Sequence, residues 1–382
     1  MAVSVRTVPR RASISNILVA TTIVAGVLAV LPIVGALGAS FFHHSAPRTA
    51  FASAPAGDYG VAARTEDDVD RIFVVPAGNP SGAMEVGAIR HLPGFAARAS
   101  VSPDGKHLAA VIAEAGTPAR PLASLVTLDL RSGLLTRLAV DIDLLQTPLW
   151  APDGSAVVVS RTLPANDGAA TVRLLSIDAQ AKSPVVQVAE FDHALAAYAV
   201  GFSASGELTA VVIDARGSTV VRGATAVSIS SHITRDWQLS PDGSAIAFIE
   251  ADTTNGLAYR ARTVSLDGTR ATSVQAQSLT TAGQQLGVAW RPGSAAPTVG
   301  QEPSAQNSGV TAQTSELRTQ NSLTASGFDV PLAYSKNGDF LAVQRWSGAD
   351  FENAGVPQLQ FVTPDGRMPL NGFTRFFGWA SR

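Results

Sequence analysis

The chain has 382 residues, a formal net charge of −2, a pI near 6.3 and no cysteine. The lack of cysteine excludes disulfides, thiolate metal ligands, a cysteine nucleophile and the acylated cysteine of a lipoprotein. No run of Lys or Arg interleaves with aromatic residues. Together with the near-neutral charge this argues against long-range attraction to nucleic acid, so we expect no nucleic-acid partner.

The first part of the chain is expected to engage a membrane. Residues 1–13 form a short basic segment with three arginines, and residues 14–39 are apolar and uncharged. About 20 apolar residues span a bilayer, and flanking arginines favour the cytoplasmic side. The sequence therefore predicts one N-terminal apolar helix, a transmembrane anchor that places the rest of the chain outside the cytoplasm.

A cleaved signal peptide is the alternative interpretation of the same segment. Pro32 is followed by small residues at 34–36 and 36–38, which resemble a cleavage site. The protein would then be secreted or periplasmic. In both interpretations residues 40–56 form a linker. It contains the pair His43-His44, which we interpret as part of a polar spacer because no cysteine or carboxylate lies nearby to complete a metal site.

One turn pattern recurs from residue 57 to residue 382. Its three clearest copies are Pro103-Asp104-Gly105, Pro152-Asp153-Gly154 and Pro241-Asp242-Gly243, with weaker copies at 203–206, 291–293 and 335–338. Proline presets φ and glycine accepts a positive φ, so each copy predicts a hairpin turn. Equivalent positions follow one another at intervals of 37 to 52 residues. This spacing is typical of β-propeller blades.

The runs that follow these turns are apolar at consecutive positions rather than at alternate ones. They lie at 107–112, 156–159, 208–213, 245–249 and 340–343. Continuous apolar strands are typical of sheets covered on both faces. We therefore expect the sheets to stack against their neighbours.

The two ends of the repeat region complement each other. Residues 376–381 match the strand before a turn but have no later strands, whereas segments 59–63, 71–75 and 84–89 resemble later strands without a first one. Joining them removes exposed sheet edges. We predict an all-β propeller of seven four-stranded blades, closed by the C-terminal strand.

Six blades is the alternative, because the fifth repeat is degenerate. It is followed at about 294–326 by a low-complexity insertion with few large apolar residues. We interpret this insertion as a disordered loop. The alternative interpretation is a recognition loop that a partner orders.

An aromatic residue, Ser-Pro-Asp-Gly, an apolar strand and a later strand ending in Asp together resemble the TolB-like, WD-repeat-like propeller repeat of bacterial envelope proteins. The resemblance covers about residues 56–382. It implies a ring attached to the bacterial cell membrane that docks another envelope protein or a peptide. Because this repeat type also occurs in propeller domains of some peptidases, it does not decide the activity.

The sequence contains only weak candidates for catalytic and metal sites. Residues 201–206 approach a nucleophile elbow, but Ser205 stands where the motif needs glycine. The acidic cluster at 66–70 lacks the alternating ligands of a calcium loop, so a solvated turn is favoured. We expect no catalytic residue, no metal and no cofactor.

The aromatic residues suggest one contact site. Four tryptophans share the position before a turn and are assigned to core packing: Trp150, Trp237, Trp290 and Trp379. Trp346 falls outside this register and follows Arg345. We therefore predict Trp346 and Arg345 as an exposed contact for a partner.

These observations favour a non-catalytic, membrane-tethered binding or scaffold propeller that docks a protein or peptide on its ring face. The alternative is a propeller hydrolase or lyase acting on peptide or glycan in the central channel, with acids such as Asp214, Asp236 and Glu250. A signalling sensor is disfavoured because only 13 residues precede Ile14.

Overall fold

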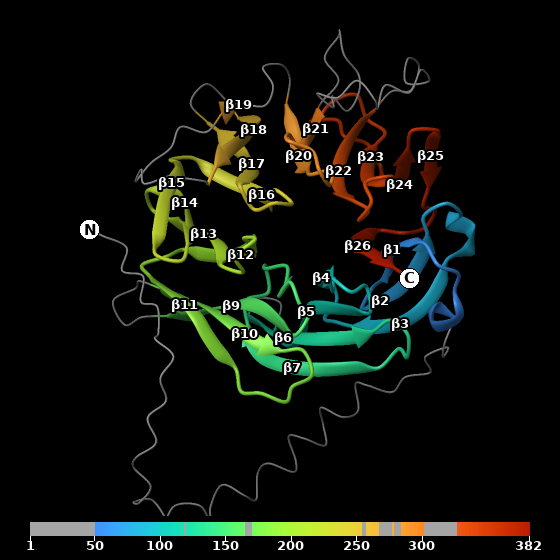
Figure 1. The fold of residues 1–382 in the computed structure, drawn as a ribbon, viewed down its shortest axis with the longest axis horizontal. Helices are drawn as coiled ribbons and strands as arrows, with labels where there is room; N and C mark the ends of the chain where they lie inside the picture. Colours follow the sequence, from blue (N-terminus) through green and yellow to red (C-terminus); the bar gives the residue numbers. More distant parts are fainter. Residues whose placement is uncertain are drawn as a thin grey trace, which may run out of the picture.

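The computed structural model describes residues 50–117, 120–164, 170–253, 257–266, 277–278, 284–301 and 327–382. Within these residues the chain is all β, apart from two single 3₁₀ turns, η2 (Phe51–Ser53) and η3 (Pro80–Gly82). The sheets stand around a common centre as the blades of a β-propeller (Figure 1). The predicted fold class is confirmed at this level.

The blades are numbered from the one that closes the ring. Blade 1 consists of β26 (Arg375–Ser381), β1 (Asp58–Glu66), β2 (Val69–Pro76) and β3 (Met84–Arg90). Blade 2 consists of β4 (Arg98–Val101), β5 (His107–Thr117), β6 (Arg120–Asp129) and β7 (Leu135–Ile142). Blade 3 consists of β8 (Leu149–Trp150), β9 (Ala156–Pro164), β10 (Ala170–Asp178) and β11 (Val186–Asp192).

The second half of the ring follows the same order. Blade 4 consists of β12 (Ala196–Phe202), β13 (Leu208–Asp214), β14 (Gly217–Arg222) and β15 (Thr225–Ser230). Blade 5 consists of β16 (Ile233–Leu239), β17 (Ala245–Asp252), β18 (Ala258–Ser265) and β19 (Gln277–Ser278). Next come the two-stranded sheet of β20 (Gln285–Ala289) and β21 (Thr298–Gln301), and the last blade of β22 (Phe328–Tyr334), β23 (Leu341–Trp346), β24 (Pro357–Thr363) and β25 (Gly366–Pro369).

The prediction of seven four-stranded blades is wrong. The described residues form six four-stranded blades, the number that the sequence left as the alternative, and the remaining sheet pairs β20 with β21 only. The sequence after β21 contains few large apolar residues, which is why the repeat pattern weakens there.

Three of the predicted segments differ from expectation or lie partly or wholly outside the described residues. The N-terminal helix expected at residues 14–39 lies outside the described residues, and within those residues no helix is long and apolar enough to cross a membrane. The end of the expected linker belongs to the folded body, because Phe51 is buried and its ring meets Tyr59 edge-on at 5.2 Å. The expected insertion at 294–326 includes the buried strand β21, and its residues 302–326 lie outside the described residues.

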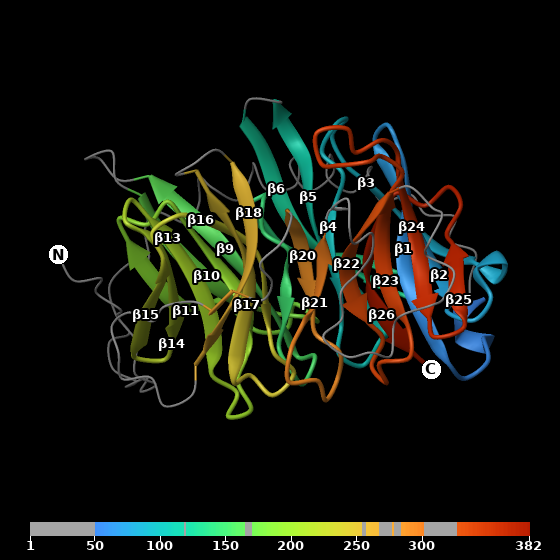
Figure 2. The ribbon, with the colours of Figure 1, turned by 90° about the horizontal axis from the view of Figure 1, so that it is seen from above.

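The ring is closed by its C-terminal strand, as the sequence predicts. Strand β26 pairs antiparallel with β1, so that Trp379 stands opposite Gly60 and Ala380 opposite Tyr59. Both views show the red β26 beside the blue β1 (Figures 1 and 2). At the seam, the Phe361 and Trp379 rings lie 4.7 Å apart, and Phe376 contacts both.

The repeated Pro-Asp-Gly sequences form tight turns. In each turn the glycine N–H donates to the carbonyl three residues earlier at 2.8–2.9 Å, and the glycine φ is 70–73°. In the third turn, hydrogen bonds from Ser240 and Ser244 to Asp242 lower the pKa of this carboxyl group to about 2. The aspartate therefore orders the turn as a carboxylate that accepts several hydrogen bonds.

These turns define the two faces of the ring. In blades 2 to 5 and in the last blade a turn joins the first strand to the second, so these turns lie on one side, here named the turn face. Gly57 and Arg382 exchange backbone hydrogen bonds at 3.0 Å on this side, next to the turn at Gly105. The opposite side, here named the loop face, carries the β5–β6 hairpin and the connections between blades; Figure 2 shows this hairpin at the top and the C-terminus at the bottom.

Three of the repeat tryptophans join neighbouring blades. Each donates its indole N–H to a carbonyl on the first strand of the preceding blade: Trp150 to Ser100 at 3.0 Å, Trp290 to Gln238 at 3.1 Å and Trp379 to Ala333 at 3.0 Å. Trp237 differs, because it donates to Thr234 Oγ1 on its own strand at 2.8 Å. The structural role predicted for the series thus includes a specific inter-blade hydrogen bond.

Candidate binding surfaces

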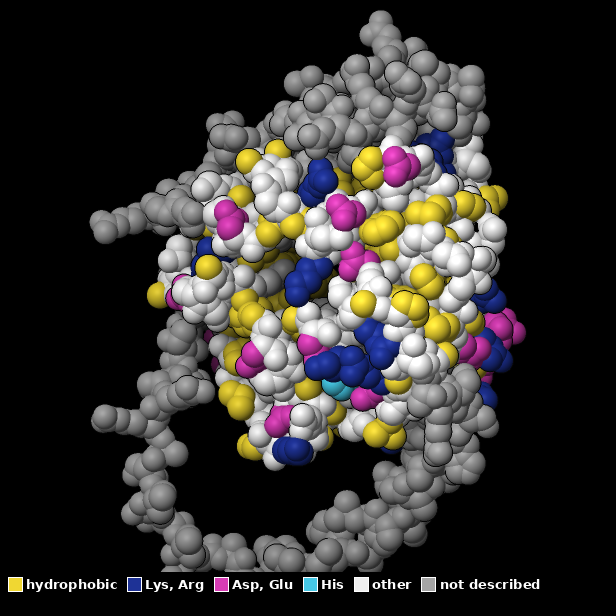
Figure 3. All heavy atoms as spheres, turned by 45° about the vertical axis from the view of Figure 1, so that its right-hand side comes forward, with side chains coloured by type: hydrophobic (Ala, Val, Ile, Leu, Met, Phe, Trp, Pro, Cys, Tyr) yellow, Lys and Arg dark blue, Asp and Glu magenta, His cyan; other side chains and the backbone are white. Residues whose placement is uncertain are grey.

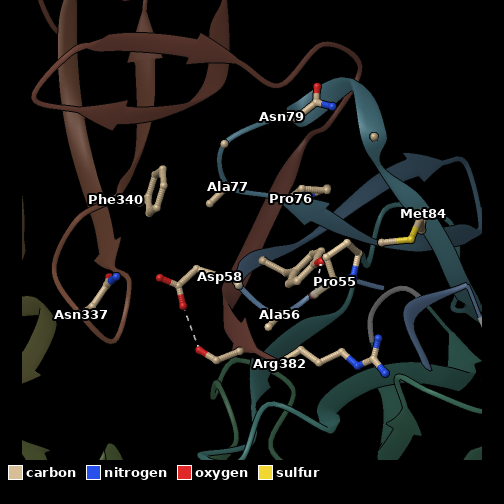
Figure 4. A pocket seen from close by; sticks show the side chains of 15 residues that line it. Pro55, Ala56, Asp58, Pro76, Ala77, Asn79, Met84, Asn337, Phe340 and Arg382 are labelled. Atoms are coloured by element: carbon tan, nitrogen blue, oxygen red, sulfur yellow. Dashed lines mark hydrogen bonds between the residues drawn. The ribbon is translucent and has the colours of Figure 1, made fainter. Parts of the chain in front are cut away.

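A pocket of about 730 Å³ lies on the turn face at the closure of the ring. Figure 4 shows Asn337 and Phe340 on one side of this closure pocket, and Pro76, Ala77 and Asn79 on the other. The remaining wall comes from the chain just before β1 and from the end of β26. Most of the lining is proline, glycine, alanine, methionine and aromatic residues, so the pocket is mainly apolar.

The polar side chains of the closure pocket are already engaged by their neighbours. Asp58 accepts a hydrogen bond from Ser381 Oγ at 3.0 Å, the dashed line in Figure 4, and Tyr59 Oη donates to the Pro55 carbonyl at 2.7 Å. Arg382 donates to the carbonyl of Ala54. The pocket therefore offers mainly apolar contacts, and hydrogen bonds among its polar residues fix its walls.

A second pocket of about 500 Å³ lies on the loop face between the last blade and blade 1. Val356, Leu370 and Phe373 supply apolar walls, and Arg345 supplies a guanidinium group. Arg64 lies near this wall, with its guanidinium carbon 4.6 Å from the centre of the Phe373 ring. This second pocket thus combines apolar and cationic groups.

The structure separates the two predicted contact residues. Arg345 lines the loop-face pocket, but its Nη1 also lies 3.4 Å from the fully buried carboxylate of Asp329, which Arg367 binds at 2.7 Å. Trp346 is half-buried and stacks on Phe328 with ring centres 6.3 Å apart. Trp346 and Arg345 remain a predicted partner contact, with Arg345 in a pocket wall and Trp346 packed on its own sheet.

Each of the three acids considered for a hydrolase is bound by its own arginine. Asp214 accepts hydrogen bonds from Arg216, which lower its pKa, and Glu250 is buried and accepts from Arg262 at 2.9 Å and from Ser230 at 2.6 Å. Asp236 pairs with Arg235 at 2.6 Å and its side chain is 45% exposed, yet desolvation by the surrounding ring raises its pKa. Of the three acids, Asp236 is therefore the one whose pKa is raised.

Asp236 also has an unusual backbone. Its φ is 55°, a left-handed value that few residues other than glycine adopt, and it lies where the register of β16 shifts against β17. This left-handed residue could not be predicted, because the residues around Asp236 follow the ordinary strand pattern.

A buried ionic pair in blade 1 was missed in the sequence because its members are 21 residues apart. Asp70 and His91 are both buried, with His91 Nε2 3.6 Å from Asp70 Oδ2. Burial opposes the charge on each group, but the attraction between the two opposite charges, and the hydrogen bonds that Asp70 accepts from Thr65 and Ala97, outweigh it. The pKa of Asp70 is therefore lowered and that of His91 raised.

Charges elsewhere are mixed. In the view of Figure 3, basic and acidic side chains are interspersed over the surface of the ring, and hydrophobic side chains lie in the hollow at its centre. In the part of the chain that the structure describes, no three His, Asp or Glu side chains are grouped to hold a metal ion. In the acidic cluster at 66–70, Glu66 pairs with Arg71 and Asp68 with Arg90.

Comparisons with known proteins concern the fold. No family model and no curated protein matches the sequence. Among solved structures, TolB from Acinetobacter baumannii is 13% identical with a TM-score of 0.48, over 85% of this chain and 65% of that protein. A putative TolB from Agrobacterium tumefaciens is 14% identical with a TM-score of 0.41, over 85% of this chain and 100% of that one.

An enzyme is also similar. The acylaminoacyl peptidase of Pyrococcus horikoshii is 10% identical with a TM-score of 0.48, over 82% of this chain and 52% of the peptidase. The chain thus spans less than two thirds of the length of this peptidase and of the Acinetobacter protein. At such identities the likeness concerns the propeller fold and assigns neither an activity nor a partner.

Proposed function

We propose that this chain is a non-catalytic binding or scaffold propeller that works outside the cytoplasm, tethered to the bacterial cell membrane through residues 14–39. In this proposal the ring docks a protein or peptide partner of the cell envelope. The observation that carries it is the closure pocket, which is large, mainly apolar and framed by polar groups that are already hydrogen-bonded. Concave apolar surfaces with few polar groups are typical of binding sites.

The arrangement of the acids supports binding over hydrolysis. A hydrolase needs two groups with different protonation states positioned on one substrate. Here Asp214, Asp236 and Glu250 are each held by a separate arginine. The raised pKa of Asp236 is the one observation that favours the alternative, a hydrolase or lyase acting on peptide or glycan at the centre of the ring.

Site-specific photo-crosslinking tests the binding proposal. A photoreactive residue at Asn79, on the rim of the closure pocket, should crosslink one discrete partner in intact cells, whereas the same residue at the exposed Gln180 of blade 3 should not. Equal crosslinking from both positions, or none from Asn79, would count against the pocket as the docking site. The membrane tether is tested in the same cells by fractionation and by the mass of the mature N-terminus.

The alternative has its own test. A panel of peptide and glycan substrates should give no turnover above background with the wild-type protein. Turnover that disappears in Asp236→Asn, a variant that keeps the side-chain size and tolerates the left-handed backbone, would replace the binding proposal by the hydrolase.

A further inference from the structure

Large hydrophobic side chains are exposed at one recurring place on the loop face. Leu145, Leu195 and Ile233 are 65%, 69% and 70% exposed, and each lies in the connection that leads into the first strand of its blade or starts that strand. These first strands, β8, β12 and β16, belong to consecutive blades, and β12 contacts both of the others. The three side chains therefore follow the inner edge of the ring from blade 3 to blade 5.

The row continues over the two-stranded sheet to the last blade. Ile233 and Arg235 are two residues apart on β16 and so share a face of the strand. The Arg235 guanidinium carbon lies 4.8 Å from the centre of the Tyr259 ring, and this ring meets Phe351 edge-on at 5.4 Å. Gln284 links this group to Leu257, because its amide donates to the Leu257 carbonyl. Leu257 and Phe351 are also exposed. We name this surface the apolar patch: Leu145, Leu195, Ile233, Leu257 and Phe351.

Single exposed hydrophobic residues are ordinary, but a cluster on one face marks an interaction surface. The segments that carry the apolar patch consist of connections and the adjoining strand ends, at 141–148, 192–195, 231–236, 252–257 and 346–356. Their acidic residues are Asp141, Asp143, Asp192, Asp236, Asp252, Asp350 and Glu352. Arg235 is the one Lys or Arg within them, Arg161 of β9 pairs with Asp141 at 3.7 Å, and Arg345 directly precedes the last segment. The apolar patch is therefore surrounded by an excess of negative charge.

The lysines lie on the other side of the ring. The chain has three, and Lys106, Lys182 and Lys336 all stand in turns of the turn face. The termini of the ring also meet on the turn face, through Gly57 and Arg382. The apolar patch thus lies on the face opposite the lysines and the meeting point of Gly57 and Arg382.

From this juxtaposition we propose that the loop face docks a basic amphipathic segment of a protein partner, with its apolar side chains on the apolar patch and its Lys or Arg residues beside the surrounding acids. The inference rests on the binding function proposed above and names the chemistry of the partner. Complementary charge favours encounter and fixes orientation, while aromatic and apolar contacts supply affinity. An anionic membrane surface or a nucleic acid is a poor occupant, because the surrounding acids repel it.

The test uses the full chain in nanodiscs of phosphatidylcholine and two synthetic peptides of about 18 residues, or five helical turns. One peptide combines Leu and Lys at helical spacing, and the other combines Leu and Glu in the same order. Fluorescence anisotropy should show binding of the Leu/Lys peptide at least about tenfold tighter than that of the Leu/Glu peptide. Raising the salt from about 0.05 M to about 0.5 M should weaken the binding several-fold, because acids such as Asp141, Asp192 and Glu352 are exposed to solvent.

Variants locate the peptide. Ile233→Ser combined with Phe351→Ser should weaken binding about tenfold or more. Leu134→Ser combined with Val188→Ser is the matched control, because Leu134 is 64% exposed on the turn face and Val188 is exposed on the outer strand β11. This control should bind as the wild type does. Circular dichroism checks that both double variants remain folded.

Several outcomes would overturn the inference. These are equal binding of the two peptides, no binding of either, unchanged binding by the Ile233/Phe351 variant, or a wild-type dimer in sedimentation that this variant converts to a monomer. In the last case the apolar patch is a contact between copies of the chain. If the inference fails while Asn79 still crosslinks a partner, the binding function stands and docking occurs on the turn face.

Discussion

The closing blade and the two-stranded sheet both depart from the repeated unit, but in different ways. In blade 1 the first strand comes from the far end of the chain, and the aromatic rings of Phe361, Phe376 and Trp379 fill the seam. In the two-stranded sheet the fit depends on small residues, since a Cβ at Gly287 or Gly300 would lie less than 3 Å from atoms of β22. A propeller can thus accommodate an irregular blade by long-range aromatic packing or by close backbone approach.

The largest effect is expected at the aromatic seam. Trp379→Ala removes the contacts to Phe361 and Phe376 and the hydrogen bond to Ala333, so urea denaturation should show a loss of about 3–5 kcal/mol. Trp346→Ala is the control, because the Trp346 ring stacks on the Phe328 ring at 6.3 Å, away from the seam. It should cost clearly less. Equal losses would mean that closure depends on no special packing and that Trp346 belongs to the core.

The next largest effect is expected from a buried charged pair in the closing blade. The two-stranded sheet has no counterpart, because β20 and β21 carry no ionisable side chain. Asp70→Asn removes one member of the buried pair with His91 and should cost about 3 kcal/mol near pH 5–6. The lowered pKa of Asp70 contributes stability above about pH 4 that is lost as the pH falls through the folded pKa. The raised pKa of His91 contributes stability below about pH 6.5 that is lost as the pH rises through its folded pKa.

Denaturation curves between pH 3 and pH 8 measure both sides of this window. His91→Gln should remove the alkaline decline and keep the acid one, because Thr65 and Ala97 still donate to Asp70. Hydrogen exchange should localise the change to blade 1 and leave β20 and β21 unaffected. A wild-type protein whose stability is flat across this range would contradict the assignment.

The contrast also explains which features the sequence could reveal. The turns at Gly105, Gly154 and Gly243 are set by a few adjacent residues, and the closure follows from two ends that complete one blade. These features are local or periodic. Phe51 is a single buried residue in the expected linker, so no sequence pattern could predict that it packs on Tyr59.

Candidate surfaces were harder to predict for the same reason. The apolar patch consists of single residues from separate segments of the chain. In the sequence, a single Leu or Ile beside a strand cannot be told from a residue of that strand. The Asp70–His91 pair and the Asp236 bulge depend on neighbours brought together by folding. Trp346 stood out by its register, yet its stacking on Phe328 could not be foreseen from spacing.

A smaller effect distinguishes the aromatic packing at the seam from the close backbone approach in the two-stranded sheet. Gly300→Ala places a Cβ 2.5 Å from the Asp329 carbonyl oxygen, whereas Gly60→Ala places it 2.4 Å from the ring of Phe361. Overpacking of this kind costs about 1–3 kcal/mol. The backbone of β22 cannot yield without moving its sheet, so we expect Gly300→Ala to lie at the upper end of the range and Gly60→Ala at the lower. The reverse order in urea midpoints would show that the seam is the more rigid region.

The smallest effect tests a feature that both irregular regions share. Trp290→Phe and Trp379→Phe each retain an aromatic ring but leave a carbonyl of the preceding blade without its indole donor. Because one buried hydrogen bond contributes about 1 kcal/mol, the two variants should lose similar, small amounts of stability. Trp237→Phe is the matched variant within a blade, since its N–H bonds Thr234 of the same strand. If Trp379→Phe alone costs as much as Trp379→Ala, the hydrogen bond rather than the packed rings closes the ring, and the aromatic account of the seam fails.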